Sequence, residues 1–104
     1  MKMEVKYQLS YGTLTLYMYG ELDEYSSSNV KRIIDKVVYS NSTSSKVIFD
    51  LSGVTFMDST GIGLLIGRYK TLKELNIPTF ITGTNVSTEK VIQLSGLYKI
   101  MPKI

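Results

Sequence analysis

Alternation of apolar and polar residues near the start of the chain predicts two β-strands. From residue 13 to residue 19 the alternation is strict, which is the period of a half-buried strand, and the apolar face holds Leu14, Leu16 and Met18. Residues 3–9 predict a first strand, and only the short Tyr11-Gly12 turn separates the two segments. We therefore expect an antiparallel hairpin.

Helical periodicity follows in three places. The first stripe comes after three serines that are suited to capping a helix, and it consists of Val30, Ile33, Ile34, Val37 and Val38. Its opposite, polar face carries Lys31, Arg32, Asp35 and Lys36. The second stripe consists of Ile62, Leu65, Ile66, Tyr69 and Leu72, and the segment 76–78 with its proline ends that helix. A shorter third helix is expected to begin near Ser87, to carry the apolar residues Val91, Ile92 and Leu94, and to end at the glycine Gly96.

Short apolar runs between these helices predict further strands. Residues 46–51 suit a strand that is buried on both faces, residues 79–82 form the next strand, and residues 99–104 are expected to form a last one. Strands that alternate with helices predict a single α/β domain over residues 1–104, with a mixed sheet of four to five strands. Functional residues in such folds gather in loops at the carboxyl ends of strands, here residues 20–25 and 55–63.

Composition excludes several function classes. The chain has no histidine and no cysteine, so Ser-His-Asp and Cys-His catalysis, disulfides and Cys/His zinc sites are all impossible, and we expect neither an enzyme nor a cofactor. The net charge is +3, but the basic residues are scattered, which argues against direct binding to nucleic acid. No long apolar run predicts a membrane span, and no apolar leader follows the start, so a cytoplasmic location is expected.

Asp58 and Ser59 stand where the second helix is expected to begin, and this is the most informative segment. One interpretation is structural, because either side chain could serve as the cap of that helix. The other is functional, since a hydroxyl at a helix start is open to a kinase. A phosphate there would add about −1.5 to −2 charges to a surface that a partner must desolvate.

Four segments together resemble the STAS-domain anti-sigma-factor antagonists. They are Gly20-Glu21-Leu22-Asp23, Phe56-Met57-Asp58-Ser59-Thr60-Gly61-Ile62-Gly63, Gly67-Arg68-Tyr69-Lys70 and Leu94-Ser95-Gly96-Leu97-Tyr98-Lys99-Ile100. They occur in the order and spacing of that family over nearly the whole chain. The third segment favours the sporulation branch of the family over its general-stress branch.

The resemblance implies a regulator that works by switching partners. The unphosphorylated form would bind a serine-kinase anti-sigma factor and release its sigma factor, the kinase would phosphorylate Ser59, and a metal-dependent serine phosphatase would remove the phosphate. The residues that it implies for partner binding are Leu22, Asp23, Asp58, Thr60, Gly61, Ile62 and Gly63.

Two departures from the family pattern accompany this resemblance. The family commonly has serine after the acceptor, whereas this chain has Thr60, so Ser59 is chosen as the acceptor by resemblance alone. The family also continues into a final amphipathic helix, which we expect to be missing here. The alternative function is a STAS scaffold, or a module that senses a nucleotide or another ligand, without a phosphorylation switch.

Overall fold

Four strands form one mixed sheet in the computed structural model, which describes residues 3–104. In chain order and side by side they are β1 (Glu4–Ser10), β2 (Thr13–Leu22), β3 (Lys46–Met57) and β4 (Thr79–Thr82). β1 pairs antiparallel with β2, while β2, β3 and β4 run parallel. The predicted hairpin and the predicted mixed α/β architecture are confirmed. The first two residues of the predicted domain lie outside the described part.

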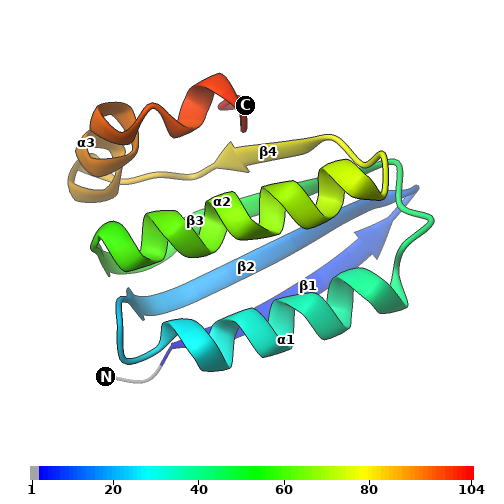
Figure 1. Cartoon of the computed structure of the whole chain (residues 1–104), viewed down its shortest axis with the longest axis horizontal. Helices are drawn as coiled ribbons and strands as arrows, with labels where there is room; N and C mark the ends of the chain where they lie inside the picture. The colour runs from blue at the N-terminus through cyan, green and yellow to red at the C-terminus, as the bar shows by residue number, and fades with distance from the viewer. Residues whose placement is uncertain (1–2) are drawn as a thin grey trace.

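Two helices cover one face of this sheet. α1 (Ser27–Ser40) connects β2 to β3, and α2 (Ser59–Glu74) connects β3 to β4, so both cross over between parallel strands and lie on the same side. α3 (Val86–Ser95) lies beyond the β4 edge (Figure 1), and a short 3-10 helix over Leu97–Lys99 follows it. Among residues 3–104, no helix is long and apolar enough to cross a membrane.

The core lies between the helices and the sheet. The predicted apolar face of β2 is fully buried there, beside the buried side chains of the neighbouring strand β3. From the first helical stripe, the structure buries Val30, Ile34, Val37 and Val38, while Ile33 is only partly covered. From the second, it buries Ile62, Leu65 and Leu72, and Ile66 and Tyr69 pack partly exposed against the core.

Both central strands are longer than the sequence predicts. β2 continues to Leu22 and β3 to Met57, whereas residues 20–25 and 55–63 were expected to be loops. Backbone pairing between the two strands continues past the apolar run, with two register shifts that each leave an extra residue on β3, and ends with Leu22 opposite Met57. Gly53 permits this pairing, because a Cβ atom there would lie 2.3 Å from the ring of Tyr19.

Near the carboxyl end the predicted third helix is confirmed but little buried, and the predicted last strand is wrong. Leu94 is 81% exposed, because α3 lies at the edge of the sheet and buries only Thr88 and Ile92. Residues 99–104 form no strand; they make a single parallel bridge between Lys103 and Ile81, beside Pro102, which has no N–H to donate. The predicted glycine cap is confirmed, since Gly96 adopts a left-handed conformation with φ of 76°.

Candidate functional site

The candidate site lies where β2 and β3 end together. Leu22 and Met57 are register partners, so the next residues, Asp23 and Asp58, leave the sheet side by side. The Asp58 N–H donates to the Leu22 carbonyl over 3.4 Å, which joins the two chain segments. Parallel pairing thus brings together two parts of the chain that are far apart in sequence.

Asp58 is the N-cap of α2. One carboxylate oxygen accepts from the backbone N–H of Thr60 at 2.9 Å and from that of Gly61 at 3.1 Å. Two of the N–H groups that lack partners at a helix start are therefore satisfied, and the negative charge lies at the positive end of the helix dipole. The structural interpretation of Asp58 is confirmed, and it leaves the neighbouring serine without a capping role.

Ser59 and Thr60 are the first two residues of α2, and both are exposed. Within residues 3–104, neither hydroxyl takes part in a hydrogen bond. The hydroxyls are therefore open to an external phosphoryl donor. In the described residues, no group of three acidic side chains is placed to hold a metal ion.

Gly61 allows the start of α2 to pack closely against the end of β2. A Cβ atom at this position would lie 2.6 Å from the Leu22 carbonyl oxygen and 2.8 Å from Cγ of Met57. Such contacts are shorter than packed atoms tolerate, so only glycine allows this approach. Leu22 is fully buried and Ile62 is nearly so, and both belong to the hydrophobic core.

Asp23 organises the turn between β2 and α1. Its Oδ1 accepts from the backbone N–H groups of Tyr25 and Ser26, at 3.0 and 3.1 Å. The Ser26 hydroxyl donates to the Glu21 carbonyl at 2.7 Å and accepts from the Asp23 N–H at 3.1 Å. Ser26 occupies the cap position of α1 but makes no side-chain cap bond to that helix, so the predicted serine cap is wrong in its chemistry.

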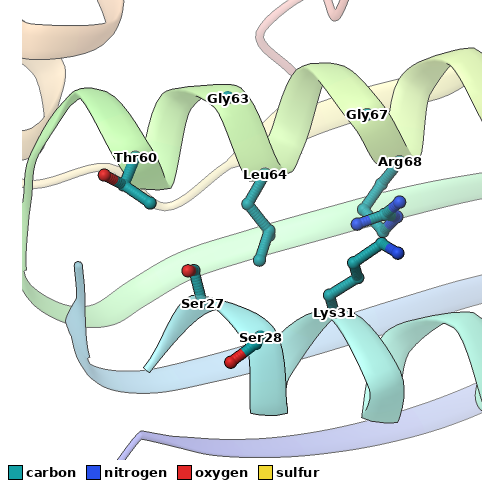
Figure 2. Close-up of a pocket in the computed structure, with 8 residues that line it drawn as sticks. All are labelled: Ser27, Ser28, Lys31, Thr60, Gly63, Leu64, Gly67 and Arg68. Carbon is teal, nitrogen blue, oxygen red and sulfur yellow. The ribbon is translucent and has the colours of Figure 1, made fainter. Parts of the chain in front are cut away.

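A groove between α1 and α2 continues from the same surface (Figure 2). Its volume is about 470 Å³, and its lining residues are Ser27, Ser28, Lys31, Thr60, Gly63, Leu64, Gly67 and Arg68. Of these, only Thr60 and Gly63 were predicted as site residues. The others were missed because the groove exists only once the two helices pack together.

An ion pair lies beneath this groove. The Arg68 side chain is only 8% exposed, and its Nε lies 2.9 Å from Oδ1 of Asp35, although the pair is not aligned as a hydrogen bond. From the sequence, Asp35 belongs to the polar face of its helix. In the structure Asp35 is half-buried, because α2 packs beside that face and partly covers it. The sequence does contain a signal that Arg68 is buried. Arg68 lies four residues after Leu64 and four before Leu72, which is the spacing of one face of a helix.

Comparison with known proteins identifies the family. The STAS domain model matches residues 4–104. The chain belongs to the STAS domain family. An anti-sigma F factor antagonist of Paenibacillus polymyxa is 28% identical over 102 residues, which cover 98% of this chain and 86% of that protein. An anti-sigma F factor antagonist of Lysinibacillus sphaericus is 32% identical over 85 residues, covering 82% and 72%.

Solved structures share this STAS fold. The unphosphorylated anti-sigma factor antagonist SpoIIAA superposes with a TM-score of 0.78 at 24% identity, covering 97% of this chain and 88% of that one. The Bacillus cell fate determinant SpoIIAA in its phosphorylated form gives a TM-score of 0.70 with 97% and 91% covered. The similarity in sequence to several antagonists, together with this fold, supports a regulatory role of the same general kind.

Proposed function

We propose that this chain is a cytoplasmic anti-sigma factor antagonist that is switched by phosphorylation of Ser59. The unphosphorylated form binds a serine-kinase anti-sigma factor and frees the sigma factor, and a metal-dependent serine phosphatase restores this form. The observation that carries the proposal is that Ser59 is exposed and that its hydroxyl has no hydrogen bond within residues 3–104, directly beside the carboxylate that caps α2.

Electrostatics explains why one phosphate would be enough. Asp58 already places a negative charge at this helix start, and Asp23 lies at the adjacent strand end. A phosphate adds about −1.5 to −2 charges in the same place, all of which a partner would have to desolvate. Without phosphate, Asp58 is compensated by two N–H groups of the helix, and the surface is ready to be covered.

The residues implied for partner binding divide into two groups. Thr60 and Gly63 are exposed and Asp23 is half-exposed, so these offer direct contact, while Asp58 holds the helix start in place. The remaining three, Leu22, Gly61 and Ile62, are buried, so they would act through the packing of the α2 start and not by direct contact. Asp23 and Asp58 place negative charge at this surface, which favours a protein partner over the phosphates of nucleic acid.

Calorimetric titration against the anti-sigma factor of the organism that carries this chain tests the proposal. Ser59→Asp should weaken binding by about 2–3 kcal/mol, or about 30- to 150-fold, as for a residue at the centre of an interface. Ser59→Ala should bind like the parent, and so should Ser40→Asp, which adds the same charge at the far, exposed end of α1. Equal binding by Ser59→Asp and the parent would overturn the switch.

A further inference from the structure

Two glycines line the α2 side of the groove between α1 and α2, beside the side chains of Leu64 and Arg68. Gly63 and Gly67 lie one helical turn apart on α2, and a Cβ atom built on either meets no atom within 4 Å. Neither glycine has a positive φ, so no backbone conformation requires it. Glycine inside a helix is less stable than alanine. Packing within the chain does not account for these two glycines, whereas it does account for Gly61.

A second observation is the guanidinium that lines the same groove. Arg68 Nε is buried against Asp35, whereas the two terminal nitrogens remain accessible and, within residues 3–104, donate no hydrogen bond to the protein. A guanidinium has five N–H donors in a fixed fork, and water can satisfy those that are not buried. The accessible part of this fork is therefore available to an acceptor that enters the groove.

The charge of the groove indicates which acceptor would fit. Lys31 lines the groove, is exposed, and forms no ion pair within the described residues. In Figure 2 the charged ends of Lys31 and Arg68 point toward the same part of the groove. Since Asp35 balances only one of these two cations, a negatively charged group is favoured.

We propose that this groove receives an acidic helix of the partner protein, whose backbone packs over Gly63 and Gly67 and whose carboxylate binds Arg68 and Lys31. Glycines one turn apart let a second helix approach closely, as ridges pack into grooves. The groove begins at Thr60, next to Ser59, so the helix would continue the contact surface of the switch. This proposal rests on the proposed function and extends its interface along α2.

Two kinds of variant test the proposal by calorimetric titration against the same anti-sigma factor at several salt concentrations. Gly67→Leu fills the groove, and Gly67→Ala fills it less; both should fold, because their Cβ atoms meet open space. Binding should weaken by about tenfold or more for leucine and by less for alanine. Thermal unfolding of each variant verifies that the fold is intact.

The charge variant is Lys31→Glu, and its control is Lys36→Glu, an equal charge change at an exposed site on the same helix outside the groove. Lys31→Glu should weaken binding by about tenfold and flatten its salt dependence, while Lys36→Glu should change little. Parent-like binding by Gly67→Leu, or equal losses in both lysine variants, would overturn the groove proposal and leave the switch intact. If the parent itself fails to bind, the proposed function is overturned and the groove loses its partner.

Discussion

The starts of α2 and α3 differ in whether a hydroxyl group there makes a hydrogen bond within the chain. Both helices begin after parallel strands, and both have a side-chain cap, Asp58 in one and Asn85 in the other. At α3 the Thr88 hydroxyl accepts from the Asn85 N–H at 3.1 Å, and Thr88 as a whole is 1% exposed, so this hydroxyl is buried in the capping box. At α2 the carboxylate caps alone, and the Ser59 hydroxyl is exposed and unbonded within the described residues. The Thr88 hydroxyl therefore stabilises its helix, whereas the Ser59 hydroxyl is accessible for modification.

The largest effect on stability is expected at Gly61. Gly61→Ala places a methyl group 2.6 Å from a backbone carbonyl oxygen that cannot move without disturbing β2. We expect a loss of about 3 kcal/mol in the free energy of unfolding. The matched control is Gly63→Ala on the same helix, which should gain up to about 1 kcal/mol because its Cβ meets open space. Urea unfolding of both variants measures the difference, and similar values for the two would contradict the packing described for the α2 start.

Thr88→Val removes only the hydroxyl of the capping box. The Asn85 N–H then loses its partner, and we expect a cost of about 2 kcal/mol in the free energy of unfolding. Ser59→Ala is the corresponding change at α2, and it should cost no more than about 0.5 kcal/mol. Thermal unfolding compares the two variants. If Ser59→Ala proved as costly as Thr88→Val, the Ser59 hydroxyl would have a structural role.

Asp58→Ala removes the cap of α2 and should cost about 1 kcal/mol. Asp58→Asn keeps an oxygen for the N–H groups of Thr60 and Gly61, so its stability should remain close to that of the parent. Urea unfolding distinguishes the two substitutions. Equal destabilisation by both would show that the charge of Asp58, rather than its hydrogen bonds, stabilises the helix start.

The smallest effect concerns Glu89 in the first turn of α3. Hydrogen bonds from Thr84, Tyr98 and Lys103 lower the pKa of Glu89 from its ordinary value of 4.5 to about 2. Because the unfolded chain binds the proton more tightly, the contribution of Glu89 is complete above about pH 4.5 and is lost as the pH falls toward 2. Glu89→Gln should therefore flatten the fall in stability between those pH values. Unfolding measured from pH 6 to pH 2 tests this, and an unchanged slope would contradict it.

The predictions from sequence that succeed rest on local patterns. Period-two alternation predicts the hairpin, and helical stripes predict α1 and α2, because these patterns follow from backbone geometry alone. The sequence predicts the ends of β2 and β3 too early. The pairing of Gly20 with Val54 and of Glu21 with Phe56 depends on backbone groups and on Gly53, and no apolar pattern marks it.

Features that depend on packing between elements were not predictable in this way. The pair of Arg68 with Asp35 needs α1 beside α2, and the exposure of Leu94 needs α3 at the sheet edge. At the candidate site, the sequence indicated Asp58, Ser59 and Asp23 but not the groove that continues from them. Its lining side chains come from two helices that are far apart in the chain.

The most direct test of the central claim is to locate a phosphate on the chain. The protein is incubated with ATP and the serine-kinase anti-sigma factor, and intact mass and tandem fragmentation are measured for the parent, Ser59→Ala and Thr60→Ala. The account predicts one phosphate on Ser59 in the parent and in Thr60→Ala, and none in Ser59→Ala. A phosphate on Thr60, or no phosphate at all, would contradict it and leave this segment as a capped helix start without a switch.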